Sequence, residues 1–388
     1  MATTLNLIPI VKGIMLWPII IILGCSGTVT ARGSSSPPAQ VRANGAPYQN
    51  GKFRNPHLPA KGRWGDFWRW RLGLGPKEEN VVAAALVSPY QPQILRPDQN
   101  SLNHADPQTI QITWLGHATF LIQVAGLNIL TDPMFSERAS PLSFVGPKRL
   151  IPLPLHQEEL PPIQAAVISH NHYDHLDEAS VKKLGPTVTF FVPRGLARWF
   201  QQRGLPLAQE LDWWQTTEFG PIRLHCVPTQ HFSMRSPFDA NKTLWGGWVL
   251  ETPAGNIFFA GDTGYSPDFQ EIGQRHGPFR LALIPIGGYM PRWFMKPMHV
   301  NPEEAVQIHR DVRAQQSIGM HWGTFKLTEE PVAEPPLFLQ QVLRAQQLPE
   351  EQFLVLRPGE TKVFSADQRG KAALGQDSFT ATSSRPGG

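Results

Sequence analysis

Cysteine is almost absent from this sequence of 388 residues, which contains only Cys25 and Cys226. Cys226 lies in a strand-like apolar run at residues 222–227, where a buried and inert thiol is the default interpretation. Cys25, by contrast, ends the apolar stretch of residues 13–24. Two cysteines in such different contexts exclude a fold held together by disulfides. Charged residues are also scarce, at 17%, whereas hydrophobic residues make up 41%. That balance is typical of a globular protein and excludes disorder along the whole chain.

The excess of positive charge is small. The formal net charge is +4 and the sequence pI is near 9.1, which favours anionic substrates or surfaces. Outside one short segment the basic residues are scattered, whereas a nucleic-acid-binding protein needs an extended basic stripe. We therefore expect no nucleic-acid partner.

The sequence lacks an apolar run long enough to cross a membrane comfortably, which takes roughly 20 residues. The run from Ile14 to Leu23 is shorter and suits the hydrophobic region of a signal peptide. Residues 22–25 (ILGC) are similar to a bacterial lipobox, in which the cysteine is lipidated. We expect residues 1–24 to be a lipoprotein-type signal peptide and Cys25 to be the lipidated residue. An uncleaved signal anchor and a cleaved secreted form are the alternatives. Lipidation would anchor the chain in the bacterial cell envelope, at the outer membrane or facing the periplasm.

Three further segments flank the core. Residues 25–60 are rich in Gly, Ser, Pro and Asn, a composition that predicts a flexible tether. Residues 61–108 form an arm that begins with aromatic and basic residues. Trp64, Phe67 and Trp68 have helical spacing among arginines, which suits a membrane surface. The alternative is that these aromatic residues dock the arm on the core, and both can hold. Residues 366–388 are expected to be a disordered tail.

Short apolar runs separated by turn residues fill residues 109–365, which we take as one domain. Strands in series followed by helices, repeated in two halves, predict an α/β fold with two mixed sheets packed together and helices outside. Asn301 is the expected N-cap of a helix over residues 301–313, because Pro302 and two glutamates follow it.

A dense cluster of metal-binding side chains follows the buried strand at residues 165–169. His170, His172, Asp174 and His175 lie within six residues, and imidazole and carboxylate are ligands suited to zinc and related divalent ions. One ion would use only part of the cluster, so two adjacent ions are the natural interpretation.

Three isolated residues also stand just past short apolar strands: His231, Asp262 and His321. Their shared placement predicts that four strand ends converge on one metal site. Of the other histidines, His225 alternates within a strand and is expected to be a core residue or a neighbour of a ligand. His117 lies between two strands and is expected to support the site, whereas His299 is a candidate for substrate contact.

These residues resemble the metallo-β-lactamase superfamily and, more narrowly, the family of N-acylphosphatidylethanolamine-hydrolysing phospholipases D. The matching motifs keep the family's order along residues 113–363. They are residues 113–119 (TWLGHAT), 131–133 (TDP), 146–149 (GPKR), 169–177 (SHNHYDHLD), 210–214 (ELDWW), 259–265 (FAGDTGY), 291–296 (PRWFMK), 302–305 (PEEA) and 321–325 (HWGTF). The resemblance implies an αββα sandwich with helices on both outer faces.

The resemblance also implies roles. His170, His172 and His231 would hold one zinc ion, Asp174, His175 and His321 would hold the second, and Asp262 would bridge the two. A hydroxide between the ions would attack phosphorus, with His299 stabilising the charge, to give phosphatidic acid and an N-acylethanolamine. Asp174 is a conceivable proton donor, and Tyr173 is expected to contact substrate or close the pocket. The family often dimerises, so a homodimer is possible.

Two positions depart from the family. Met298 stands where the family has glutamine before the histidine, and Met290 stands where it carries glutamate. Both changes make the surroundings of the headgroup more apolar. The alternatives to a phospholipase D are another hydrolase of the superfamily, such as a lactonase or a phosphodiesterase on a soluble substrate, and a non-catalytic envelope lipoprotein. Because all seven expected ligand positions are filled, the non-catalytic reading is disfavoured.

Overall fold

The computed structural model describes residues 45–58, 64–82 and 90–365. The expected signal peptide, Cys25, most of the expected tether and the expected tail lie outside these residues. Within them, no helix has the length and apolar character needed to span a membrane.

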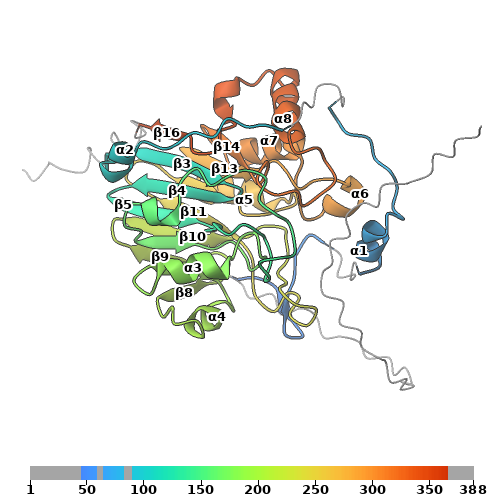
Figure 1. The fold of residues 1–388 in the computed structure, drawn as a ribbon, viewed down its shortest axis with the longest axis horizontal. Coiled ribbons are helices and arrows are strands. Elements are labelled where there is room, and N and C mark those ends of the chain that lie inside the picture. The colour runs from blue at the N-terminus through green and yellow to red at the C-terminus, as the bar shows by residue number, and fades with distance from the viewer. Residues whose placement is uncertain (1–44, 59–63, 83–89, 366–388) are drawn as a thin grey trace, which may run out of the picture.

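Two seven-stranded mixed sheets face each other (Figure 1). In the first sheet the strands lie in the order β16-β3-β4-β5-β6-β7-β8, antiparallel from β16 to β5 and parallel from β5 to β8. Its strands are β3 (Ile110–Gly116), β4 (Thr119–Val124), β5 (Leu127–Thr131), β6 (Ala165–Val167), β7 (Thr189–Pro193), β8 (Ala208–Leu211) and β16 (Thr361–Phe364).

The second sheet repeats this plan. Its order is β15-β14-β13-β12-β11-β10-β9, antiparallel from β9 to β12 and parallel from β12 to β15. Its strands are β9 (Thr216–Phe219), β10 (Ile222–Val227), β11 (Gly247–Glu251), β12 (Ile257–Phe259), β13 (Leu281–Pro285), β14 (Ser317–Met320) and β15 (Phe353–Leu354). The prediction of two mixed sheets is therefore confirmed.

The helices are α1 (Trp64–Arg71), α2 (Gln99–Asn103), α3 (Glu178–Leu184), α4 (Ala197–Gln201), α5 (Asp268–His276), α6 (Arg292–Met295), α7 (Pro302–Asp311) and α8 (Glu334–Ala345), with short 3₁₀ turns at Gln157–Glu159 and Glu350–Gln352. Helices α2, α3 and α4 cover the outer face of the first sheet and α5, α7 and α8 that of the second, whereas α1 packs on α6. Asn301 caps α7 as expected, because its side chain accepts from the Glu304 N–H and the Glu304 carboxylate accepts from the Asn301 N–H.

The alternation of side chains along each strand builds two apolar layers. Phe120 and Ile122 of β4 point into the layer between the sheets, with Leu224 of β10, whereas Leu121 points to the outer layer beneath α3 and α4. The layer between the sheets is continuous with the packing of α5, α7 and α8 on the second sheet. This four-layer arrangement leaves the connecting loops at the sheet ends free to carry chemistry.

The last part of the expected tether is not free. Strands β1 (Tyr48–Gln49) and β2 (Lys52–Phe53) form a small hairpin, and the Phe53 side chain is buried. The Ala46 N–H donates to Asp212 at 2.8 Å, and the Phe53 N–H donates to the Asn241 carbonyl at 2.8 Å. Backbone bonds to the core fix this stretch although its composition is that of a linker.

Part of the aromatic arm packs on the core, and another part remains exposed to solvent. Trp70 of α1 stacks on Phe294 of α6 at 5.2 Å between ring centroids, and its Nε1–H donates to Glu329 at 2.9 Å. Trp68, Leu72 and Leu74 remain largely exposed. Helices α1 and α6 lie side by side at one end of the molecule (Figure 1). Docking of the arm on the core is therefore confirmed for Trp70, whereas contact of the exposed residues with a membrane surface stays a prediction.

Candidate metal centre

Four strands deliver the expected ligands to one place. The loop after β6 carries His170, His172, Asp174 and His175, and β10, β12 and β14 are followed by His231, Asp262 and His321. Strands that run in the same direction end at the same edge of a sheet, so loops from both sheets meet there. The Gly246 N–H, just before β11, donates to the Ser169 carbonyl at 2.9 Å and joins the two sheets at this edge.

Glycines allow the loops to approach closely. Gly261 has φ +60°, and a Cβ there would lie 2.5 Å from the Ser169 Cβ. Gly288 has φ +85°, and a Cβ there would lie 3.1 Å from His299 Nδ1 and 3.2 Å from the His321 ring. Because only glycine combines this conformation with the absence of a side chain, the two positions permit the histidines to crowd together.

Three imidazoles form the first group. His170 Nε2 lies 2.8 Å from His172 Nδ1, and His231 Nε2 lies 3.3 Å from the same atom. The Asp262 Oδ2 atom is 4.0 Å from His170 Nε2 and 3.8 Å from His231 Nε2. Four ligand atoms therefore face one small space.

The second group shares the same carboxylate oxygen. His175 Nε2 and His321 Nε2 each lie 3.1 Å from Asp262 Oδ2. They lie 3.4 Å and 3.5 Å from Asp174 Oδ2. Asp262 thus stands between two sets of three ligands, as a bridging ligand does.

Whether metal ions fit this site can be judged from the hydrogen bonding of its buried nitrogen and oxygen atoms. Asp262 Oδ1 is buried and makes no hydrogen bond within the described residues, and the buried His175 Nε2 and His321 Nε2 make none of good geometry, although both lie within ion-pair distance of Asp262 Oδ2. Leaving such atoms without a partner costs free energy, which a bound cation would remove. Imidazole nitrogens with a few carboxylate oxygens are the donor set of zinc and neighbouring divalent ions, so the residues fit the group.

A second set of side chains orients the ligands. Asp132 accepts from His175 Nδ1 at 2.7 Å and from the Ser169 Oγ–H at 2.6 Å, and His170 Nδ1 lies 2.8 Å from Ser169 Oγ. His231 Nδ1 donates to the Met298 carbonyl at 2.9 Å. Each bond turns the Nε2 atom towards the centre and fixes the tautomer.

Sequence reasoning assigned no role to Asp132 or Ser169. The signal was present, because Asp132 directly follows β5 and Ser169 follows β6, the same strand-end placement that marked the ligands. Partners of ligands carry no residue-type signature of their own, so only the fold distinguishes them from ordinary turn residues.

The site has opposed charges. Burial lowers the pKa of His172 to about 4 and that of His231 to about 3, so these imidazoles are neutral. Burial opposes charge on His321 as well, but Asp262 outweighs it and raises the pKa of His321 to about 9. Burial would likewise raise the pKa of Asp262, yet His175 and His321 hold it well below its usual range. Without metal, two protonated histidines thus neutralise the two carboxylates.

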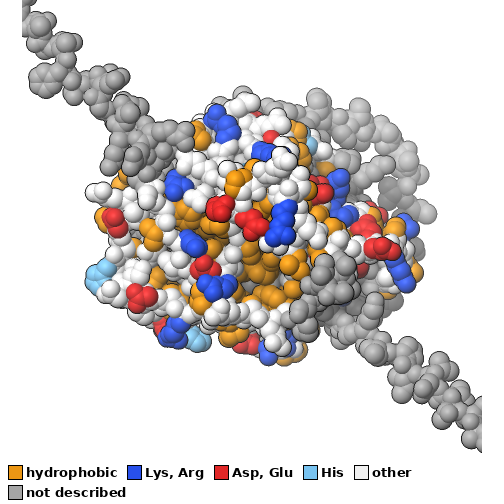
Figure 2. Space-filling view, turned by 90° about the horizontal axis from the view of Figure 1, so that it is seen from above, with side chains coloured by type: hydrophobic (Ala, Val, Ile, Leu, Met, Phe, Trp, Pro, Cys, Tyr) orange, Lys and Arg blue, Asp and Glu red, His pale blue; other side chains and the backbone are white. Residues whose placement is uncertain are grey.

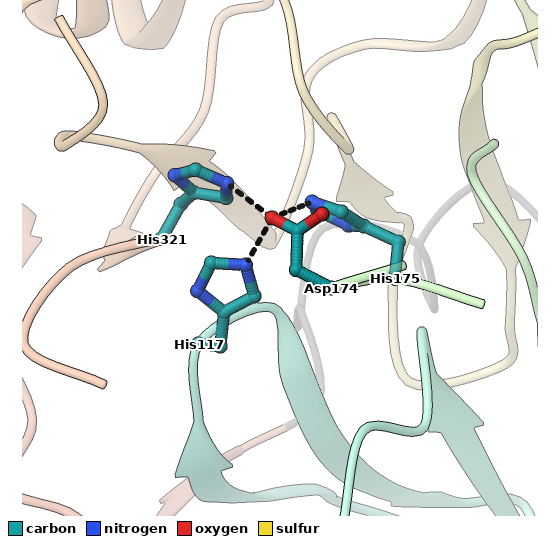
Figure 3. Close-up of side chains that lie close together, drawn as sticks. All are labelled: His117, Asp174, His175 and His321. Carbon is teal, nitrogen blue, oxygen red and sulfur yellow. Dashed lines mark hydrogen bonds and ion pairs between the residues drawn. The ribbon is translucent and has the colours of Figure 1, made fainter. Parts of the chain in front are cut away.

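His117 supports the centre from the β3–β4 turn. Its Nε2 atom lies 3.0 Å from Asp174 Oδ2, and Figure 3 shows that oxygen surrounded by His117, His175 and His321. The His117 N–H donates to Thr324 Oγ1 at 2.7 Å, and its carbonyl accepts from the His321 N–H at 3.1 Å. These contacts agree with a supporting position beside Asp174.

His299 lies at the open side of the centre. Its Nδ1 atom is 4.0 Å from Asp262 Oδ2 and makes no hydrogen bond within the described residues, and burial lowers its pKa to about 3. The rings of His231 and His321 lie 5.1 and 5.4 Å away. A neutral imidazole with a free nitrogen beside the shared carboxylate is placed to meet a substrate.

Tyr173 has a partner already. Its O–H donates to the Arg235 carbonyl at 3.0 Å, and the Arg235 guanidinium lies 4.0 Å over its ring. Arg235 also donates to the carbonyls of Asn171 and Leu176 at 2.9 and 2.7 Å. Tyr173 and Arg235 therefore brace the loop that carries the cluster.

His225 lies away from this centre. Its contacts are with Thr216, Glu251 and His276. Of the two alternatives expected for His225, a buried residue of the strand is therefore confirmed and a neighbour of a metal ligand is wrong.

Comparisons with known proteins agree with the resemblance of the sequence motifs. Residues 127–322 match the family described as the beta-lactamase superfamily domain. The chain is 44% identical over 272 residues to N-acyl-phosphatidylethanolamine-hydrolyzing phospholipase D 1 of Caenorhabditis elegans, covering 66% of this chain and 76% of the relative. It is 39% identical to the mitochondrial N-acyl-phosphatidylethanolamine-hydrolyzing phospholipase D of Saccharomyces cerevisiae, covering 58% of this chain and 49% of the relative.

Solved structures share the fold. A metallo hydrolase of Ignicoccus hospitalis superposes with a TM-score of 0.52 at 24% identity, covering 67% of this chain and all of that one. An isothiocyanate hydrolase from Delia radicum gut bacteria superposes with a TM-score of 0.54 at 20% identity, covering 66% of this chain and all of that one. At these identities the likeness concerns the fold alone.

Proposed function

The chain belongs to the metallo-β-lactamase superfamily, as a metal-dependent hydrolase, and we propose that it is a zinc-dependent phospholipase D acting on N-acylphosphatidylethanolamine or a related phospholipid. The observation that carries the proposal is the meeting of two ligand groups at Asp262 Oδ2 in a chain 44% identical to a phospholipase D of that name. Water would add to phosphorus, the bond to the ethanolamide oxygen would break, and the proton would end on that leaving oxygen.

Two ions would be held by the seven residues that converge. His170, His172 and His231 would bind one, Asp174, His175 and His321 the other, and Asp262 both. When bound, such ions supply a water of lowered pKa and positive charge near the phosphate. Asp132, Ser169 and the Met298 carbonyl would keep the imidazoles oriented.

His299 would act on the substrate. It carries a neutral ring with an unpartnered Nδ1 at the edge of the centre, where a phosphate oxygen would approach. A hydrogen bond from a preorganised donor stabilises charge that develops as the bond to the leaving group breaks. Asp174, whose side chain is 15% exposed, is the carboxylate open to the same side and the proposed route for the proton.

A lipid substrate is supported by the surface beside the centre. The exposed Trp68, Leu72 and Leu74 are held next to α6 through Trp70, and α6 leads directly into Met298 and His299. Aromatic and aliphatic side chains of this kind partition into the headgroup region of a membrane. On the face seen in Figure 2, basic side chains are scattered among acidic ones and form no stripe.

Another hydrolytic activity of the same fold is the second candidate. Met298 and Met290 replace the glutamine and the glutamate of the family pattern, which removes one hydrogen-bond donor and one carboxylate. A lactone or a soluble phosphodiester would need fewer headgroup contacts than a phospholipid.

The test is a direct assay of the purified full chain in detergent. We expect release of N-acylethanolamine from mixed micelles of N-acylphosphatidylethanolamine, loss of release on chelation and recovery with zinc. An enzyme that keeps its metal but hydrolyses only lactones or soluble diesters would contradict the lipid assignment.

Anchoring in the cell envelope through lipidated Cys25, a membrane partner and a homodimer remain proposals from the sequence. Radiolabelled palmitate incorporation in cells, lost in Cys25→Ser, would test the anchor. Sedimentation of the purified chain would test the dimer.

A further inference from the structure

A second group of histidines and a carboxylate lies within the second sheet. His225 is in β10, Glu251 ends β11, and His276 ends α5. The Glu251 Oε1 atom lies 3.1 Å from His225 Nε2 and 3.3 Å from His276 Nδ1, and the two rings are 4.4 Å apart between centroids. Three ligand atoms from three elements therefore face one point.

The group is separate from the metal centre. β11 begins at Gly247, next to the residue that bonds Ser169, and Glu251 lies four residues further along the strand. At roughly 3.3 Å per residue, this places Glu251 about 13 Å from that edge of the sheet.

The atoms of the group are prepared for a cation. Thr216 Oγ1 lies 2.7 Å from His225 Nδ1, which fixes the ring, while the buried His225 Nε2 makes no hydrogen bond of good geometry within the described residues and has Glu251 Oε1 as its ion-pair neighbour at 3.1 Å. Arg223 donates to Glu251 Oε2 at 3.2 Å and leaves Oε1 directed at the histidines.

Access and charge also suit an ion. The His276 and Glu251 side chains are 13% and 27% exposed, so an ion can enter and keep a water ligand. The charged groups nearby are Arg223, which pairs with Glu251, and Glu218, which lies 3.6 Å from Arg223. The carboxylates thus outnumber the guanidinium.

We propose that His225, Glu251 and His276 form a separate site for a divalent transition-metal ion such as Zn²⁺, distinct from the metal centre. Two imidazole nitrogens, one carboxylate oxygen and a water complete the four ligands that zinc prefers. The ion would tie β10 and β11 to the end of α5 and stabilise this side of the second sheet.

The experiment uses the full chain, stripped of metal and titrated with Zn²⁺, with bound equivalents counted by elemental analysis. We expect His276→Ala and Glu251→Gln each to bind one equivalent fewer than the unaltered chain. His104→Ala, which changes an exposed histidine outside both groups, is the matched control and should lose none. Asp262→Asn should lose ions of the metal centre and keep the equivalent that His276→Ala removes.

Equal zinc content in the unaltered chain, His276→Ala and Glu251→Gln, with unchanged circular dichroism, would reduce the group to an ion pair. Should His276→Ala fold poorly, Glu251→Gln, which keeps the size of the side chain, decides alone. The readout is zinc content, so it does not depend on the activity proposed for the metal centre.

Discussion

The metal centre and the group of His225, Glu251 and His276 use the same residue types in different settings. In the centre every ligand stands in a loop just past a strand. The positive charges of the protonated His175 and His321 there balance the negative charge of the carboxylates. In the second group the ligands lie inside strands and at a helix end, and Arg223 supplies part of the compensating charge. Loops at a sheet edge can bring many ligands together and leave room for substrate. Positions within strands hold few ligands rigidly, which suits a structural ion.

The largest expected effect comes from removing the carboxylate that the two ligand sets of the metal centre share, a change that leaves the group of His225, Glu251 and His276 intact. Asp262→Asn should lower kcat/KM on the order of 10³-fold, because each of the two proposed ions would lose a charged ligand and the transition state would lose several kcal/mol of stabilisation. Metal content and turnover measure it, with Asp106→Asn in an exposed turn as the control. Full activity in Asp262→Asn would remove the bridging role.

Next come the partners that orient the ligand imidazoles. Asp132→Asn should weaken zinc binding at the centre about 10- to 100-fold, and Thr216→Val should weaken it about tenfold at the second group. Equilibrium titration with a zinc-selective dye measures both, and excess zinc should rescue the turnover of Asp132→Asn. Unchanged affinity in either variant would show that the bond does not orient its ligand.

The number of protons released on zinc binding also distinguishes the metal centre from the second group. In the metal-free chain His175 and His321 are protonated at pH 7, because Asp262 raises the pKa of His321 to about 9 and that of His175 well above its usual range, against the effect of burial. Zinc must displace these protons, so loading the centre at pH 7 should release about two per chain. Affinity should rise with pH, and the rise should become less steep above about 9, where His321 loses its proton unaided and only the proton of His175 remains to be displaced. Calorimetry in buffers of different ionisation enthalpy counts the protons.

Proton release on zinc binding should be smaller at the second group, because burial lowers the pKa of His225 and its ring is already neutral at pH 7. The equivalent lost in His276→Ala should therefore bind without proton release from His225. Release of the same number of protons in Asp262→Asn as in the unaltered chain would contradict the assignment of protons to the centre.

The smallest effect concerns the apolar surface that flanks only the metal centre. Trp68→Ser with Leu72→Ser should reduce liposome binding about tenfold, since exposed apolar area is removed, and change micelle turnover little. Trp70→Ala should instead lower the free energy of unfolding by about 2 kcal/mol, because its ring stacks on Phe294 and its N–H bonds Glu329. Co-sedimentation with liposomes and urea denaturation separate these outcomes.

Much of the fold could be predicted from sequence, where periodicity is strong. The apolar runs at residues 119–124, 127–131, 281–285 and 317–320 form β4, β5, β13 and β14, because the sequence of a buried strand is an apolar run between turn residues. Strands β8, β9 and β16 were missed. They lie at or next to sheet edges, and β9 exposes alternate polar side chains, so no apolar run marks them. Helix α5 was missed too, since its buried face needs only Phe269 and Ile272 beside Gly273.

By itself, the sequence determined the class of site. A run of His170, His172, Asp174 and His175 after a buried strand is too dense in metal ligands to be a chance loop, and His231, Asp262 and His321 share its placement. Only the tertiary structure decided which atoms meet, that Asp262 Oδ2 stands between two groups, and that Asp132 holds His175. It alone brought His225 to Glu251 and His276, because those contacts depend on strand register and helix packing, which leave no pattern along the chain.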